Sequence, residues 1–232
     1  MNKFLSLILV AIFSTIFSVK MDAQDAKYAT KNIAKNLRKD ACCVKREESM
    51  QFVVKDISDA LYTYHKVVTI LNHEGDYNLR FSDFTDKFDK LDDASFSMYD
   101  SNGVKIKTYQ LKDFEMNNYG EDLVQDGKYF TFMANPPAYP ITIEMNITEK
   151  YKGLLNYPSM IVQDKNQSVE NSSVQIVVPK TLGLRYKTSN LKEDCTRIED
   201  ASNTTYTWLI KDLPAKKIEH NSGPAYLYLP EI

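Results

Sequence analysis

The residues best suited to covalent chemistry are three cysteines and three histidines. A cysteine nucleophile needs a histidine base within hydrogen-bond reach and a third group that orients the base. No local signature of that kind surrounds the candidates, which are Cys42, Cys43, Cys195, His65, His73 and His220. We expect structural roles for the histidines, with His65 partly buried in a strand, His73 in a turn and His220 in an exposed linker. An unrecognised cysteine hydrolase is the outside alternative.

The cysteines predict no disulfide framework. Cys42 and Cys43 are adjacent, and Cys195 lies far along the chain. Neighbouring residues of a strand point to opposite faces, so at most one of the pair could reach Cys195. Buried free thiols are the favoured interpretation, and a single bridge from Cys195 to Cys42 or Cys43 is the alternative.

No metal or cofactor site is predicted. Zinc needs three or four grouped ligands, whereas the only close pair is Cys42 and Cys43, whose side chains diverge. The aspartates between Asp83 and Asp93 recur at every third residue, which does not match the ligand positions of a calcium loop. We therefore expect a solvated helical turn over Phe81–Asp93, with a buried face formed by Phe81, Phe84, Phe88 and Leu91. No catalytic, cofactor-binding or metal-binding residue is assigned.

The first 23 residues indicate export. Lys3 precedes an uncharged run from Phe4 to Val19 that contains no proline or glycine, and Ala23 is a small residue at a cleavage position. The run is short for a membrane anchor. We expect residues 1–23 to be a cleaved signal peptide and the mature chain to be periplasmic or secreted, without being an integral membrane protein.

The composition of the mature chain favours a globular β protein. Removing Lys3, Lys20 and Asp22 changes the net charge from −2 to −3, which gives no reason to expect nucleic-acid binding. Tyrosine and phenylalanine are abundant, at 15 and 11 copies, and glycine is scarce, at 7. Aromatic and β-branched residues favour strands, so all-β is the predicted class.

The pattern along the chain is strand after strand. A short amphipathic helix is predicted first, within residues 24–40, with Ala29, Ile33, Ala34 and Leu37 at helical spacing. Asn102-Gly103 predicts a tight hairpin turn between two of the strands. The predicted strands are Cys42–Glu47, Met50–Lys55, Leu61–Asn72, Phe96–Tyr99, Val104–Leu111, Tyr129–Met133, Ile141–Tyr151, Val174–Pro179, Leu184–Thr188 and Tyr206–Ile210. Without β-α-β alternation, this order predicts an antiparallel sandwich over residues 41–215.

Four of these segments resemble a known family. They are Tyr62–Leu71 with its acidic turn, the hairpin Ser97–Leu111, Asp126-Gly127-Lys128 before Tyr129–Phe132, and Ile143–Tyr151. Together they are similar to the DUF3857 domain of unknown function, which precedes transglutaminase-like domains in bacterial envelope proteins and is common in Bacteroidetes. The resemblance covers residues 40–215 and implies an antiparallel immunoglobulin-like β-sandwich. It implies no catalytic residues, because catalysis belongs to a following papain-like domain with Cys, His and Asp.

The tail at residues 216–232 suggests how such a module would act. The transglutaminase-like domain would follow it, so the chain is expected to be a fragment or a stand-alone accessory domain. Tyr226, Leu227, Tyr228 and Leu229 form an alternating strip with no obvious sheet to join, and we expect it to dock on a transglutaminase-like domain or another envelope protein. The alternative is a glycan- or protein-binding sandwich, for which the available aromatic residues are Tyr119, Tyr129, Tyr139, Trp208, Tyr226 and Tyr228.

Overall fold

A computed structural model describes residues 27–119, 127–154, 157–217, 223–224 and 227–232. The predicted signal peptide therefore lies outside the described residues. The elements are η1 (Thr30–Asn32), α3 (Lys35–Arg38), β1 (Cys43–Asp56), β2 (Asp59–Ile70), η2 (His73–Leu79), β3 (Arg80–Thr85), β4 (Asp89–Tyr99), β5 (Lys105–Gln110), η3 (Leu111–Asp113), β6 (Glu115–Tyr119), β7 (Gly127–Met133), β8 (Ile141–Tyr151), β9 (Gln167–Pro179), β10 (Thr196–Glu199) and β11 (Asn203–Leu213).

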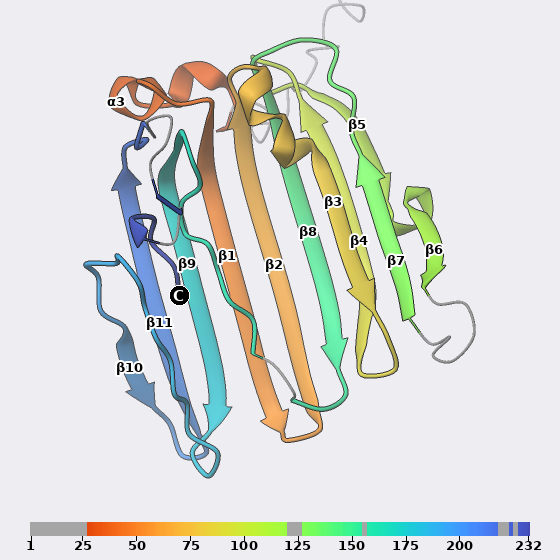
Figure 1. Cartoon of the computed structure of the whole chain (residues 1–232), viewed down its shortest axis with the longest axis vertical. Coiled ribbons are helices and arrows are strands. Elements are labelled where there is room, and N and C mark those ends of the chain that lie inside the picture. Colours follow the sequence, from red (N-terminus) through yellow and green to blue (C-terminus); the bar gives the residue numbers. More distant parts are fainter. Residues whose placement is uncertain (1–26, 120–126, 155–156, 218–222, 225–226) are drawn as a thin grey trace, which may run out of the picture.

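The described strands form a large and a small sheet (Figure 1). The large sheet has eight strands in the order β10-β11-β9-β1-β2-β8-β4-β5, and the small sheet has the order β3-β7-β6. The all-β prediction is confirmed. The prediction of purely antiparallel pairing is wrong, because β1 and β9 are parallel. The immunoglobulin-like assignment stays a prediction.

The parallel pair follows from the connection between β8 and β9. Both β1 and β8 are antiparallel to β2, which makes β8 and β1 parallel to each other. A β9 strand parallel to β1 therefore has to begin at the end of the sheet where β8 begins. The chain after β8 crosses the length of the sheet to reach that end, and Figure 1 shows the described part of this crossover, residues 152–154 and 157–166, with residues 157–166 in front of β1 and β9.

Strand β1 is continuous where two strands were predicted. Its register with β2 shifts between Lys45 and Glu47, which marks a β-bulge at Arg46. After the bulge, Glu48, Met50 and Phe52 follow Lys45 on the covered face of the sheet. The bulge explains why a strict two-residue alternation in the sequence breaks between Cys42–Glu47 and Met50–Lys55.

The predicted helical turn over Phe81–Asp93 is wrong. Residues 80–85 form β3 of the small sheet, and residues 89–99 form β4 of the large sheet. The carboxylate of Asp86 accepts from the backbone N–H groups of Phe88 and Asp89 and so holds the turn between the two strands. With two-residue alternation Phe81 is buried, whereas Phe84 and Phe88 are 42% and 36% exposed.

Several other strand predictions are confirmed with changed boundaries. The β4–β5 hairpin forms around Asn102 and Gly103, with φ of +85° at Gly103. Strand β8 matches the predicted Ile141–Tyr151. The segment predicted as strand Leu184–Thr188 has no regular structure, and β10 was not predicted. Strand β10 has only exposed residues and one neighbour, so nothing in its sequence marks a buried face.

The predicted N-terminal helix is two short turns, η1 and α3. Ile33 and Leu37 are buried as predicted, but Ala34 is exposed. An extended backbone at Ile33 and Ala34 separates the two turns and lets each apolar side chain reach the strands. Tyr28, in the same segment, packs with Val67 and Tyr99 on the sheet face opposite the crossover.

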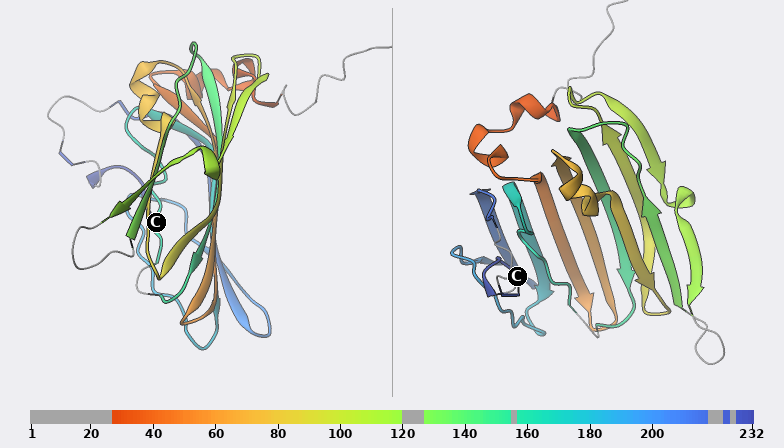
Figure 2. Two further views of the ribbon diagram at one scale, coloured as in Figure 1. Left: turned by 90° about the vertical axis from the view of Figure 1, so that its right-hand side faces the viewer. Right: turned by 45° about the horizontal axis from the view of Figure 1, so that its top comes forward.

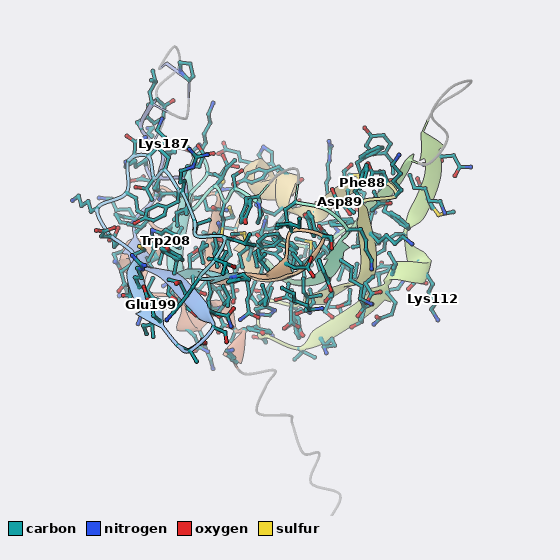
Figure 3. All side chains as sticks on the ribbon, turned by 90° about the horizontal axis from the view of Figure 1, so that it is seen from below. Phe88, Asp89, Lys112, Lys187, Glu199 and Trp208 are labelled. Atoms are coloured by element: carbon teal, nitrogen blue, oxygen red, sulfur yellow. The ribbon has the colours of Figure 1, made fainter. Side chains whose placement is uncertain are left out.

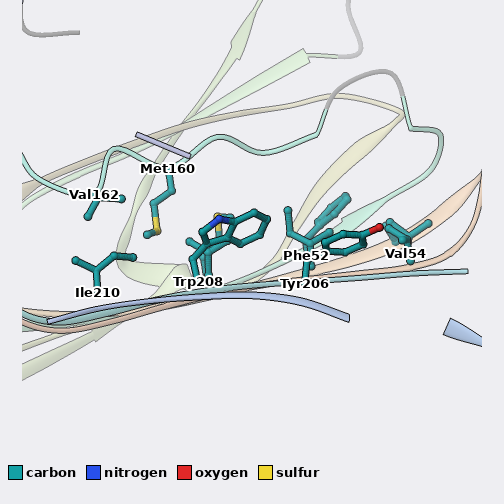
Figure 4. Close-up of a cluster of buried hydrophobic side chains, with 12 residues drawn as sticks. Phe52, Val54, Met160, Val162, Tyr206, Trp208 and Ile210 are labelled. Atoms are coloured by element: carbon teal, nitrogen blue, oxygen red, sulfur yellow. The ribbon is translucent and has the colours of Figure 1, made fainter. Parts of the chain in front are cut away.

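One face of the large sheet carries two covers (Figure 2). The small sheet lies over the β4 and β8 side and buries Phe81, Leu91 and Ala94 between the sheets. The crossover and the C-terminal tail lie over the β9 and β11 side. In Figure 4, Met160 and Val162 of the crossover point toward Trp208 and Ile210 of β11, which are fully buried.

Candidate functional site

The cysteines are free thiols. Cys42 and Cys43 lie at the start of β1 with their sulfur atoms 3.9 Å apart, and both are buried. Cys195 is half-buried and contacts the Tyr186 hydroxyl at 3.0 Å. The prediction of free thiols is confirmed, and the alternative bridge from Cys195 to Cys42 or Cys43 is not formed.

Among the described residues, neither His65 nor His73 is hydrogen-bonded to a cysteine. His65 is half-buried in β2, as predicted, and its Nδ1 lies 2.8 Å from Oδ1 of Asn146. Its Nε2 lies 3.8 Å from Glu47. His73 is exposed at the start of η2. His220 lies outside the described residues.

The described residues contain no group of three or more His, Cys, Asp or Glu side chains arranged to hold a metal ion. Asp83 and Asp89 nevertheless lie with Glu149 between the two sheets. Burial raises the pKa of Glu149 to about 7, and the charges of Asp83 and Asp89 add to this effect. Burial also raises the pKa of Asp83 to about 6. These carboxylates therefore resist ionisation where the small sheet meets the large one.

A hollow lies between the large sheet, η2 and the crossover. In Figure 3, Lys187 of the 180–195 loop and Phe88 of the β3–β4 turn rise from the same face of the large sheet, on opposite sides of the molecule. The hollow has a volume of about 320 Å³. Its lining comes from β1, β2, η2, the crossover and the first residue of β9: Lys45, Glu48, Met50, Tyr62, Tyr64, Lys66, Tyr77, Asn78, Ser159, Met160, Ile161, Asp164 and Gln167.

A buried ion pair forms the floor of this hollow. Lys45 Nζ lies 2.7 Å from Glu48 Oε2, and the two side chains are 4% and 2% exposed. Lys45 also donates to the carbonyl oxygens of Ile161 and Val162 in the crossover. Lys45 therefore uses all three of its donors and ties the crossover to the sheet.

Glu48 is equally well satisfied. Its Oε1 accepts from the Tyr64 hydroxyl at 2.6 Å, and its Oε2 accepts from the Ser172 hydroxyl at 2.7 Å as well as from Lys45. Burial and the Glu48 charge raise the pKa of Tyr64 well above its ordinary value. The ion pair is thus a complete network that fixes three strands and the crossover.

Lys66 is a second lysine that lines the hollow. It is the cross-strand neighbour of Glu48, yet none of the described residues accepts a hydrogen bond from its amine. Burial lowers the pKa of Lys66, and the charge of Lys45 lowers it further, whereas Glu48 opposes the shift. Lys66 therefore lines the hollow without taking part in the hydrogen-bond network of Lys45 and Glu48.

Cys43 contacts three of the polar residues that line the hollow, and their side chains surround its sulfur atom. The Tyr77 hydroxyl is 3.3 Å from Sγ, and the amides of Asn78 and Gln167 donate to it at 3.4 and 3.5 Å. The Cys42 thiol also donates to Cys43, which lowers the pKa of Cys43 to about 6 and raises the pKa of Cys42. Cys43 is fully buried, so this arrangement stabilises charge without exposing a nucleophile.

Sequence reasoning missed Lys45, Glu48 and Lys66. Their signal was the position of charged residues within strand-forming segments, in the run Lys45-Arg46-Glu47-Glu48 and at Lys66 within Leu61–Asn72, because charged residues are rarely buried without partners. Among the aromatic residues singled out for binding, Trp208 is in the core, and Tyr139 is 39% exposed and donates to Asp76. Tyr129 is 37% exposed on the small sheet, where its ring lies 5.0 Å from that of Phe84. Tyr226 and the side chain of Tyr119 lie outside the described residues.

The tail joins this chain's own fold. Met160 and Ile232 exchange two backbone hydrogen bonds, and Ser189 and Glu231 exchange two more. Leu229 is 4% exposed, whereas Leu227 is 58% exposed and Tyr228 is half-buried. The expectation that the strip has no place in this chain is therefore wrong for Leu229, while Leu227 presents its side chain to solvent.

The fold is that of a β-rich module with a mixed sheet and a hollow on one face. A family described as "Domain of Unknown Function with solved-structure structure (DUF3857)" matches residues 59–217. The chain belongs to this family, as its sequence motifs indicated. No curated protein matches the chain in sequence.

Solved structures show the same fold in a longer protein. A crystal structure described as a candidate protease from Parabacteroides distasonis has a TM-score of 0.65 and 13% identity, covering 82% of this chain and 39% of that one. This chain thus spans well under half the length of that protein. An M1 zinc metallopeptidase from Deinococcus radiodurans has a TM-score of 0.35 and 11% identity, covering 72% of this chain and 38% of that one, which is too low to support an argument. Among the described residues, no helix has the length and apolar character needed to cross a membrane.

Proposed function

We propose that this chain is an exported, non-catalytic accessory module that packs against the catalytic domain of a transglutaminase-like or peptidase-like envelope protein. Membership of the DUF3857 family supports this role. A longer protein with the same fold, described as a candidate protease, contains further residues beyond the part that matches this chain. In the described residues, the buried charges of Lys45 and Glu48 are engaged in holding the crossover. That engagement supports a structural rather than a catalytic use of the floor network.

The observation that carries the proposal is an exposed apolar surface around the tail. Ile161, Tyr186 and Leu227 are 60%, 44% and 58% exposed. Backbone bridges from Glu231 to Ile161 and to Ser189 join the crossover, the tail and the 180–195 loop into one layer. Exposed apolar groups gathered on one layer are typical of protein interaction sites. Since Arg185 and Lys187 are exposed in the same loop, the complementary partner face is apolar and acidic.

Site-specific photocrosslinking tests this role in the native organism. We expect a photoreactive residue at Leu227 to crosslink to a domain that carries the Cys, His and Asp of a transglutaminase-like or peptidase-like site. The matched control is Val104, which is 45% exposed at the β4–β5 hairpin. Equal crosslinking at both positions, or a crosslinked partner without such a catalytic domain, contradicts the proposal. Export is tested separately, because the mature protein should begin at Gln24.

A second candidate function is glycan binding by the small sheet. Phe84 and Tyr129 are cross-strand neighbours with exposed rings, and Met133 on the same strand as Tyr129 is 65% exposed. Exposed aromatic rings suit stacking on sugar faces. Glycan-array binding that is abolished by Tyr129→Ala and retained by Val104→Ala would favour this function. If the intact protein binds no glycan on the array, glycan binding is contradicted as a function.

A further inference from the structure

We propose that the hollow between the large sheet, η2 and the crossover binds the carboxyl end of a peptide or N-acyl amino acid, with Lys66 holding the α-carboxylate. The inference rests on the lining of the hollow and does not depend on the accessory role. The volume of about 320 Å³ is within the range of small-molecule sites.

The Lys66 amine calls for a hydrogen-bond acceptor from a ligand. Glu48 accepts from Lys45, Tyr64 and Ser172, and it accepts no hydrogen bond from Lys66 in the described structure. Lys66 faces the hollow as a cation without an acceptor among the described residues. A carboxylate would satisfy it through a charge-assisted hydrogen bond in a site partly shielded from water.

The other anionic groups near Lys66 have different partners. The Cys43 sulfur is surrounded by the Tyr77, Asn78 and Gln167 side chains and is closed to solvent. The carboxylate of Asp164 accepts from the backbone N–H of Lys165. Both groups influence the protonation of Lys66 through space, but neither contacts its amine in the described structure.

Neutral groups of the lining define the rest of the ligand. Asn78 is 4% exposed, and its Oδ1 is a buried acceptor without a donor among the described residues. The rings of Tyr62 and Tyr64 are stacked, with centroids 6.2 Å apart and planes 13° apart, and they give the hollow a flat wall for an apolar or aromatic side chain.

Calorimetric titration with N-acetyl-L-tyrosine tests the proposal, and N-acetyl-L-tyrosinamide is the neutral probe of the same shape. We expect the acid to bind the intact chain about tenfold or more tightly than the amide, because only the acid pairs with Lys66. Lys66→Met should weaken binding of the acid by a similar factor and abolish the preference, whereas Lys66→Arg should retain it. Lys90→Met, at an exposed lysine of β4, is the control and should bind as the intact chain does.

Equal binding of the two probes, absence of binding by the acid, or unchanged binding by a folded Lys66→Met variant would overturn the proposal. Should Lys66→Met fail to fold, the comparison of acid and amide on the intact chain decides the matter by itself. The tripeptide N-acetyl-Ala-Ala-Tyr separates the two sources of the carboxylate. Binding at least as tight as that of N-acetyl-L-tyrosine indicates a peptide end, and weaker binding indicates a free N-acyl amino acid.

Discussion

At the residue scale, the molecule is defined by charges placed inside a β-sheet. Taking charged groups out of water is unfavourable unless they are paired and hydrogen-bonded. Lys45 and Glu48 meet this condition with each other and with neighbouring polar groups. Lys66 meets it only in part, and this difference between neighbours is what separates a structural network from a ligand site.

The first prediction concerns Glu48. Glu48→Gln leaves Lys45 as a buried cation without its carboxylate and should lower the free energy of unfolding by about 3–5 kcal/mol. Urea denaturation followed by circular dichroism measures the change. The control is Asp92→Asn, which removes an exposed pair with Lys150 and should cost about 0–1 kcal/mol. Equal effects of the two substitutions would show that the buried network does not stabilise the fold.

The second prediction concerns the pH dependence of stability. The folded state raises the pKa of Glu149 from 4.5 to about 7, so the folded chain binds more protons than the unfolded chain between these values. The free energy of unfolding should therefore fall as pH rises from about 4.5 to about 7, because stability falls with pH where the folded state holds more protons. Glu149→Gln should flatten this slope in urea titrations across the interval. A slope that persists unchanged in Glu149→Gln would assign the effect to other groups.

At the element scale, the short helix η2 positions Tyr77 and Asn78 on the hollow. It lies close to the strands because Gly75 has no side chain. A methyl group at Gly75 would lie 3.0 Å from the Cys42 carbonyl oxygen and 3.0 Å from Cγ2 of Ile70. Neither neighbour can move without shifting a strand, so the helix position depends on this glycine.

The third prediction follows from this contact. Gly75→Ala should lower the free energy of unfolding by about 1–3 kcal/mol, through overpacking between η2 and the strands. Thermal and urea unfolding measure the loss. Glu74→Ala, at an exposed neighbour in the same helix, should change stability by no more than about 0.5 kcal/mol. A Gly75→Ala variant as stable as the Glu74→Ala variant would mean that η2 moves freely away from β1.

At the scale of the whole molecule, the tail and the crossover complete the core over β9 and β11. They are joined by backbone hydrogen bonds between Met160 and Ile232 and between Val162 and Pro230. Residues widely separated in the sequence therefore form one cover. The same layer that buries Trp208 presents Leu227 and Ile161 outward, so folding and the proposed partner docking use opposite sides of it.

The fourth prediction compares two leucines of the tail. Leu229→Ala should lower the free energy of unfolding by about 2–5 kcal/mol, because Leu229 is 4% exposed. Leu227→Ala should change it by less than about 0.5 kcal/mol, because Leu227 is 58% exposed. Urea unfolding of both variants measures the contrast. Similar losses for the two leucines would contradict the described packing of the tail.

The sequence by itself determined the features that depend on local pattern. Alternating apolar residues predicted β8, a β-rich run predicted β2, and Asn102-Gly103 predicted the β4–β5 hairpin. Family membership was also accessible, because its motifs lie within single strands and turns. The Phe81–Asp93 segment failed because a three-residue recurrence of aspartates imitated helical spacing, although its residues belong to strands of two different sheets.

Only the tertiary structure decided which strands became neighbours and which charges became buried. The parallel pairing of β1 with β9 depends on the path of the crossover, which no local pattern records. The roles of Lys45, Glu48 and Lys66 depend on groups brought from η2, β9 and the crossover. The physical reason is that burial and electrostatic partnership are set by contacts between distant segments, whereas strand periodicity and turn chemistry are properties of adjacent residues.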